Sequence, residues 1–145
     1  MSQTILAALD ASDLAPLVLG AAIDMARSEE ARLRLVHVVP VPHQLPPGLL
    51  VRGPASVTEY FEDAGRARLE EYAKAVPNEL LEGIDLRMGT AWREICAVAQ
   101  LTNADLIVLG AHRHGAMDRM LGTTAARVVN HAARSVLIIR TKGGL

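Results

Sequence analysis

The sequence has few of the residues on which several protein classes depend. Its 145 residues include one cysteine, which excludes an internal disulfide and a cysteine-rich zinc site and favours a reducing compartment, the cytoplasm. Aromatic residues make up only 3%, too few for the base-stacking surfaces that bind single-stranded nucleic acid. Lys and Arg number 15 against 16 Asp and Glu, a balance that argues against a duplex-binding protein. We therefore expect no nucleic-acid partner.

Long apolar runs are also missing. The longest charge-free stretch near the start runs from Leu14 to Ile23 and contains Pro16 and Gly20. A membrane-spanning helix needs about 20 apolar residues, so this stretch is too short. Asp10 and Asp13 precede it, where a signal peptide carries positive charge. We expect neither a membrane span nor an export signal.

What the sequence does contain is enough apolar material for one globular domain over residues 1–145. About half of the residues are apolar, and a chain of this length can bury roughly 70% of its unfolded surface. Short apolar runs alternate with segments of helical spacing. The runs predict strands at Thr4–Leu9, Leu33–Val39, Ile84–Met88, Leu106–Leu109 and Val136–Ile139; the spacing predicts helices at Leu14–Met25, Val57–Ala75, Ala91–Leu101 and Thr123–Ala132.

This alternation predicts an α/β fold with a five-stranded parallel sheet and helices on both faces. In such folds the ligand lies beyond the carboxyl ends of the strands, where the strand order reverses. The loops to search are therefore those after Leu9, Val39, Met88 and Leu109. Between the second strand and the second helix, the segment Pro40–Ser56 holds five of the seven prolines, so we expect no regular element there. It is either a solvated connection packed over one sheet edge or a lid over a ligand.

Several familiar motifs are absent. No GxGxxG follows the first strand, and Gly110 to Gly115 has Walker spacing but continues with Ala116 and Met117. Neither a GxSxG elbow nor His-Glu-x-x-His or Cys-x-x-Cys spacing occurs, so we expect no metal site and no hydrolase of those types. Cys96 and His37 fall at core positions of a helix and a strand, and we interpret both as structural.

The segment after the fourth strand has features of a phosphate-binding turn. Gly122 allows close approach of a ligand, and the N–H groups of Thr123 and Thr124 open a helix whose positive end attracts anions. In the alternative interpretation Gly122 only breaks the chain and a threonine caps the helix. The segment from Gly110 to Arg134 contains four arginines and one aspartate, a charge of +3. Because the whole chain carries −1, the remaining residues carry −4. This concentration of positive charge favours a small polyanionic ligand.

The sequence as a whole resembles a universal stress protein domain. The resemblance rests on Ile5–Ser12, Leu35–Val39, Asn103–Gly110, the Gly122–Thr123 turn and His131–Ile139. It implies a Rossmann-like sheet of order 3-2-1-4-5, a homodimer formed through the last strand, Val136–Ile139, and, in one branch of the family, ATP binding with or without Mg.

The nucleotide-binding branch carries Gly-x2-Gly-x9-Gly-Ser/Thr, from which this chain departs. Arg113 stands at the second glycine, a glycine follows at Gly115, and the motif is one residue shorter. Gly110-Ala-His112-Arg113 with Leu121-Gly122-Thr123 is similar to a shorter form found in a bacterial branch. There Arg113 would supply the positive charge in place of the missing glycine N–H.

The resemblance implies a set of nucleotide-binding residues, and no catalytic ones. Asp10 would lie near the ribose and phosphates, although it could instead cap the first helix together with Ser12. The backbone of Val38 would meet the adenine edge, Ala8 would form a wall, and Gly89 would leave room for the base or simply serve the turn. The full set is Ala8, Asp10, Val38, Gly89, Gly110, His112, Arg113, Gly122, Thr123 and Thr124.

Three functions remain open at this point. The first is a cytoplasmic stress-response regulator that binds ATP and acts through its dimer or an unknown protein partner. The second is a stress scaffold without nucleotide. The third is a protein that slowly hydrolyses ATP or phosphorylates itself, for which His112, Arg113 and His114 are the only candidate groups near the γ-phosphate.

Overall fold

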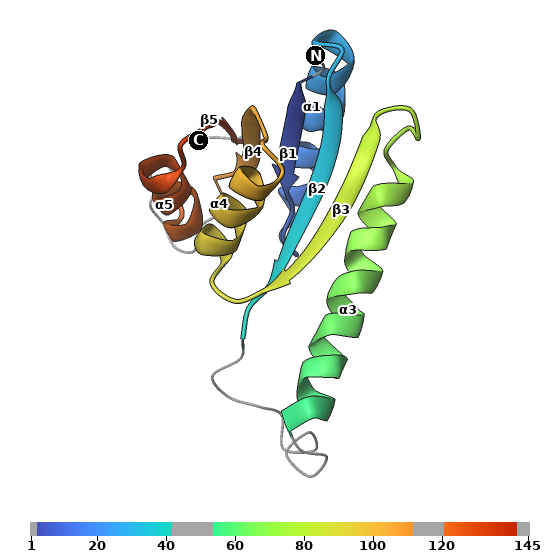
Figure 1. Ribbon diagram of the computed structural model, residues 1–145, viewed down its shortest axis with the longest axis vertical. Coiled ribbons are helices and arrows are strands. Elements are labelled where there is room, and N and C mark those ends of the chain that lie inside the picture. Colours follow the sequence, from blue (N-terminus) through green and yellow to red (C-terminus); the bar gives the residue numbers. More distant parts are fainter. Residues whose placement is uncertain (1–2, 42–53, 112–120, 142–145) are drawn as a thin grey trace.

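The computed structural model describes residues 3–41, 54–111 and 121–141. Within these ranges strands and helices alternate along the chain (Figure 1). The strands are β1 (Thr4–Ala8), β2 (Arg32–Val39), β3 (Leu81–Met88), β4 (Leu106–Gly110) and β5 (Ser135–Ile139). The helices are α1 (Ala15–Ser28), α3 (Pro54–Lys74), α4 (Ala91–Leu101) and α5 (Thr123–His131).

The strands form one parallel sheet of order β3-β2-β1-β4-β5, which confirms the predicted fold class and strand order. β1 lies at the centre of the sheet, and Ala7 pairs with Leu35 of β2 on one side and Val108 of β4 on the other. The chain therefore proceeds in opposite directions from β1, which makes its carboxyl end the reversal point where open α/β sheets bind ligands.

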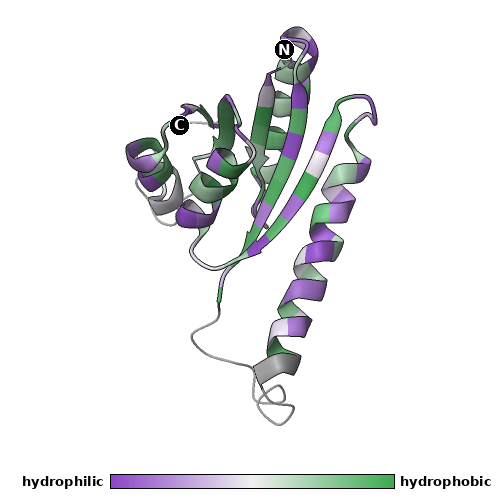
Figure 2. Cartoon of the chain, viewed as in Figure 1, coloured by the Kyte–Doolittle hydropathy of each residue, from purple (hydrophilic) through white to green (hydrophobic). Residues whose placement is uncertain are grey.

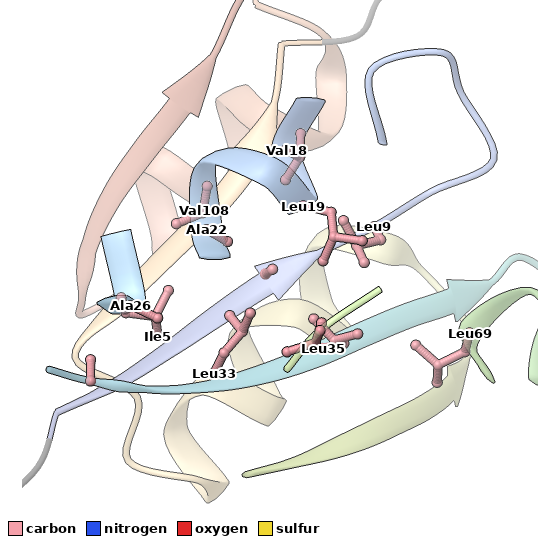
Figure 3. Close-up of a cluster of buried hydrophobic side chains, with 13 residues drawn as sticks. Ile5, Leu9, Val18, Leu19, Ala22, Ala26, Leu33, Leu35, Leu69 and Val108 are labelled. Carbon is pink, nitrogen blue, oxygen red and sulfur yellow. The ribbon is translucent and has the colours of Figure 1, made fainter. Parts of the chain in front are cut away.

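Two apolar layers cover the sheet, one on each face. Alternate residues of β1 point to opposite faces, so Ile5 and Ala7 contribute to one layer and Leu6 to the other. The first layer joins β1 and β2 to α1 and α3, and most of its residues are seen in Figure 3. The second joins the sheet to α4 and α5. The aliphatic character of both layers follows from the shortage of aromatic residues.

Helix α3 runs along β2 and β3 and is the most polar helix of the fold (Figure 2). Leu69 is buried against the first layer, whereas the neighbouring Glu70 and Glu71 are exposed. The helix begins at Pro54, so the prediction that no regular element persists up to Ser56 is wrong for its last residues. Proline is tolerated in the first turn of a helix because a backbone N–H at this position would have no carbonyl partner within the helix. Residues 42–53 lie outside the described part of the chain.

Strand β3 starts at Leu81, earlier than the predicted Ile84. Its early part alternates polar and apolar residues, and its polar side chains are held by the neighbouring strand. Arg34 of β2 contacts Asp85 at 2.9 Å and Glu82 at 3.4 Å. These ion pairs lie across the strand pair and are invisible to a search for continuous apolar runs.

Candidate functional site

A cavity of about 110 Å³ lies at the carboxyl ends of β1 and β4, at the reversal point of the sheet. Both helical layers contribute to it. Leu14 and Val18 come from the α1 side, whereas Ala91 and Ile95 come from α4. The remaining lining residues are Ala8, Leu9, Asp10, Val36, Val38, Leu109, Gly110 and Thr124. The cavity is thus an apolar slot with a carboxylate and a hydroxyl among its lining side chains.

Asp10 lines this cavity and also organises the turn that follows β1. Its Oδ1 accepts hydrogen bonds from the Ser12 backbone N–H at 2.9 Å and from the Ser12 hydroxyl at 2.6 Å. The Ser12 oxygen in turn accepts a 3.3 Å hydrogen bond from the N–H of Leu14. Leu14 is the N-cap residue of α1 and no side-chain cap is formed. Asp10, one of the lining residues, therefore supports the turn before the helix rather than capping the helix itself.

The first turn of α5 lies on another side of the same cavity, through Thr124. The N-cap residue of α5 is Gly122, with φ −63° and ψ 164°, and no side chain caps the helix. The alternative in which a threonine serves as the cap is therefore wrong. Gly122 is buried and has no positive φ, so an unusual backbone angle does not explain a glycine at this position. Uncapped N–H groups at a helix start are available to an anion.

The ends of β2 and β3 form a further side of the site. Val38 lines the cavity, and the N–H of Gly89 donates a 3.0 Å hydrogen bond to the carbonyl of Val39. Gly89 has φ +139°, a conformation that strongly favours glycine. The carboxylate of Glu94 lies next to Gly89 and forms a 2.9 Å ion pair with Arg87. The turn role of Gly89 is thus observed, while its role toward a base stays a prediction.

The structure brings half of the residues proposed for the site into one cavity. Ala8, Asp10, Val38, Gly110 and Thr124 line it together. Gly89 in the turn after β3, Gly122 at the N-cap of α5 and Thr123 at its first position lie at the same end of the sheet without lining the cavity. His112 and Arg113 fall outside the described residues.

Sequence reasoning named Ala8 and Val38 but missed the apolar lining contributed from the helices. Leu14, Val18, Ala91 and Ile95 looked like core residues because helical spacing is the same for a helix that packs on a sheet and one that also borders a cavity. Gly110 shows how closely the start of α1 approaches β4. A Cβ atom at this position would lie 3.2 Å from Cβ and Cδ1 of Leu14, so the glycine lets α1 come close to β4. A useful signal would have been that these residues lie in the first turns of helices that follow strands.

The two residues interpreted as structural behave as expected. His37 is buried, and its Nδ1 lies 2.7 Å from the carbonyl oxygen of Leu9, to which it donates. Cys96 is partly buried against the second apolar layer, and this burial raises the pKa of its thiol. Both positions thus fit a packing role.

The described residues carry neither a metal-type cluster nor a membrane-type helix. They contain no group of three or more His, Cys, Asp or Glu side chains that could hold a metal ion. No helix among them has the length and apolar content needed to cross a membrane.

Comparison with known proteins gives one consistent result. The model of the universal stress protein family matches residues 1–140. A universal stress protein of Thermus aquaticus is 33% identical over 148 residues, covering 97% of this chain and 100% of that one. The solved structure of the universal stress protein UspA from Lactobacillus plantarum is 29% identical, with a TM-score of 0.70 and coverage of 95% and 97%.

More distant solved structures share the fold and include nucleotide complexes. A universal stress protein in complex with cAMP is 21% identical with a TM-score of 0.63, covering 96% of this chain and 97% of that one. The universal stress protein from Archaeoglobus fulgidus in complex with dAMP is 20% identical with a TM-score of 0.57, covering 97% and 98%.

Proposed function

Because this chain belongs to the universal stress protein family, we propose that it is a cytoplasmic stress-response regulator that binds ATP at the carboxyl ends of its strands. Nucleotide occupancy would alter its dimer or its binding of a protein partner. The single cysteine supports a reducing compartment. Within the family fold, the complexes with cAMP and dAMP support an adenine nucleotide as the ligand class.

The observation that carries the proposal is the cavity at the reversal point, with an apolar slot, Asp10 and the uncapped start of α5 along its sides. Its mostly apolar lining suits the apolar faces of a ring system. We assign the slot to the adenine base, close to Val38. Asp10 would then accept a hydrogen bond from a ribose hydroxyl or, with Mg bound, contribute negative charge near the ion. The phosphates would reach the N–H groups that follow Gly122.

The same proposal includes a homodimer formed through β5. Among the described strands β5 pairs only with β4, so its other edge is open. Val136, Leu137, Ile138 and Ile139 on this strand are all only partly buried. An apolar open edge favours pairing with a second copy. Sedimentation should detect a dimer at micromolar concentration, and a stable monomer at high micromolar concentration would contradict this part of the proposal.

The first experiment compares melting temperatures of nucleotide-free protein with and without millimolar Mg-ATP. A ligand at about 100 times its dissociation constant adds about 2.7 kcal/mol, which raises the melting temperature by roughly 5 to 10 °C. Gly122→Val should abolish the shift because its side chain would occupy the place of a phosphate. Gly20→Val is the matched control, since a Cβ at Gly20 meets no atom within 4 Å.

Two outcomes would contradict ATP binding at this site. If wild-type protein shows no shift, the scaffold function is favoured. If a folded Gly122→Val protein keeps the full shift, the phosphates bind elsewhere. Incubation with γ-labelled ATP separates binding from slow hydrolysis or self-phosphorylation: phosphate release or labelling no greater than in Arg113→Ala would exclude the enzyme.

A further inference from the structure

A basic and aromatic surface lies on α4 and α5, outside the nucleotide cavity. The ring of Trp92, the only tryptophan of the chain, stacks on His131 with 4.5 Å between ring centroids and 26° between planes. The guanidinium carbons of Arg93 and Arg127 lie 5.2 and 5.7 Å from the Trp92 centroid. α4 and α5 lie side by side (Figure 1). One arginine from each of these helices therefore lies near the Trp92 ring.

A groove of about 320 Å³ adjoins this ring system. Its small and apolar lining includes Cys96, Ala99 and Ala132, and its polar lining includes Gln100, His131 and Arg134. His131 belongs both to the stack and to the groove, so the two features are continuous. The groove shares no lining residue with the nucleotide cavity. We call the two together the α4–α5 surface, comprising Trp92, Arg93, Arg127 and the six groove residues just named.

The positive charges of this surface are not neutralised within the described part of the chain. Residues 91–111 and 121–141 contain four arginines and only two carboxylates, Glu94 and Asp105. Glu94 is engaged by Arg87 at 2.9 Å, and Asp105 accepts a 2.8 Å hydrogen bond from the N–H of Thr4. In the ranges that the structure describes, Arg93, Arg127 and Arg134 have no carboxylate within 4.0 Å. The surface is therefore suited to a partner that brings its own carboxylates.

The geometry favours a peptide over a nucleic acid as that partner. One face of Trp92 is already covered by His131, so it cannot serve as an open platform for a base on that face. The groove beside it has a floor of alanine and cysteine side chains, which accommodates an aliphatic side chain. The chain also has a net charge of −1, which gives no general attraction for a phosphate backbone.

We infer that the α4–α5 surface docks an acidic segment of a protein partner. Carboxylates of the segment would pair with Arg93, Arg127 and Arg134, and one of its aliphatic side chains would enter the groove. This inference extends beyond nucleotide binding, because the groove of this surface shares no lining residue with the nucleotide cavity. It assigns the protein a contact site for the partner that a regulatory role requires.

The test uses a synthetic peptide of about a dozen residues in which glutamate alternates with leucine and alanine, labelled for fluorescence anisotropy. We expect saturable binding accompanied by a change in Trp92 fluorescence, weakened several-fold when salt rises from about 0.05 to about 0.3 M. Arg127→Glu and Arg134→Glu should each weaken binding about tenfold or more. Arg68→Glu, an equal charge change on the exposed face of α3, is the matched control and should leave binding unchanged.

Several results would overturn the inference. Equal weakening by Arg68→Glu and Arg127→Glu would show a non-specific charge effect, as would equal binding of a peptide with glutamine in place of glutamate. A single-stranded oligonucleotide of equal charge that binds more tightly would identify a nucleic-acid surface. If self-association of the protein displaces the peptide, the surface is an interface between copies. Melting temperatures without ATP verify that each variant is folded, and the ATP-induced shift tests the nucleotide site independently.

Discussion

The hydroxyl of Tyr72 on α3 donates a 2.7 Å hydrogen bond to the backbone carbonyl oxygen of Asp10. Asp10 follows β1 and lines the candidate nucleotide cavity, whereas Tyr72 lies 62 residues further along the chain. This bond links α3, a helix of the first apolar layer, to the loop on which the candidate site is built. It also satisfies a carbonyl that no strand partner can reach beyond the end of β1.

Removing this hydroxyl should loosen the loop. Tyr72→Phe should lower the free energy of unfolding by about 1 kcal/mol, the usual net contribution of one hydrogen bond. Urea denaturation measures the change. Tyr60→Phe removes the same group from an exposed residue of the same helix and should have little effect. Equal losses in the two variants would mean that the Tyr72–Asp10 bond contributes nothing.

Asp10 should affect nucleotide binding more than stability. Asp10→Ala removes the acceptor for Ser12 and the charge at the cavity, whereas Asp10→Asn keeps an acceptor and removes only the charge. If the carboxylate faces ATP, Asp10→Ala should weaken ATP binding at least about tenfold, or about 1.4 kcal/mol. It should lower the free energy of unfolding by less than that amount. Calorimetric titration measures the loss of ATP affinity, and urea denaturation measures the loss of unfolding free energy. A larger loss of stability than of affinity would assign Asp10 to the turn alone.

Gly65 allows α3 to lie close to β2. A Cβ at this position would come 2.5 Å from Cγ2 of Val39 and 3.2 Å from Cδ1 of Leu86. Valine has little rotamer freedom to move away, so Gly65→Ala should destabilise the protein by about 1 to 3 kcal/mol despite the higher helix propensity of alanine. Gly20→Ala, in an open helical position, should instead stabilise it by about 0.5 to 1 kcal/mol. Thermal or urea unfolding of both variants decides the matter, and stabilisation by Gly65→Ala would contradict the close packing.

The Arg34 cluster should contribute through Asp85 more than through Glu82. Arg34 Nε and Nη2 contact the two oxygens of Asp85 at 2.9 and 3.2 Å, whereas Nη1 meets Glu82 at 3.4 Å. The hydrogen bond with Asp85 is the main reason that the pKa of Arg34 is raised. We expect Asp85→Asn to cost about 1 kcal/mol and Glu82→Gln about 0.5 kcal/mol or less, because the pairs are partly exposed.

The exposed pair Glu71–Lys74 provides the control for this cluster. Its atoms approach to 3.3 Å with side chains about three-quarters exposed, so Glu71→Gln should be neutral. Urea denaturation at low and high salt measures the change in unfolding free energy for Asp85→Asn, Glu82→Gln and Glu71→Gln. A cost for Glu71→Gln equal to that of Asp85→Asn would show that partial burial does not strengthen the Arg34 pairs.

Cys96 should react slowly while the protein is folded. Burial raises its pKa, so the native thiol stays protonated at a pH where the unfolded chain already forms thiolate. Alkylation by iodoacetamide near pH 8.5 should therefore be slower in native than in urea-unfolded protein.

The same shift gives a pH dependence with a definite sign. Below the unfolded pKa the thiol is protonated in both states and has no effect. As pH rises above that value the unfolded state loses its proton first, so stability falls. The fall from pH 7 to about 9.5 should be larger in wild type than in Cys96→Ala. Equal falls would contradict the burial of this thiol.

Much of the fold could be predicted because short apolar runs and helical spacing are local properties. The predicted α4, Ala91–Leu101, matches its observed bounds. β1 lies within its predicted range, β3 starts three residues early, and each of the other strands is one residue longer than predicted. Two elements start three residues earlier than predicted, one for a long-range reason and one for a local reason. β3 starts early because Arg34 holds its polar residues, and α3 starts early because Pro54 fits a first turn.

The candidate site was predictable in its residues at the strand ends, such as Ala8, Asp10 and Val38, but not in the apolar walls contributed from the helices. Asp10 comes shortly after β1 and Gly110 ends β4, so topology places both at the carboxyl end of the sheet. Ile95 and Val18 also line the cavity, but their spacing only indicates burial in a helix. The same types of apolar side chain occur in a packed layer and at a cavity wall. They differ only in whether another side chain fills the space beside them.

The sequence by itself determined which segments become strands and helices, because hydrophobic periodicity selects one face of each element for burial. It also determined that a glycine and two threonines stand at the start of α5, where the first N–H groups have no carbonyl partner within the helix. Only the tertiary structure decided which distant residues meet. Trp92, Arg93, Arg127 and His131 form one surface because α4 and α5 pack side by side on the sheet. That arrangement depends on strand order and helix packing, which no local pattern specifies.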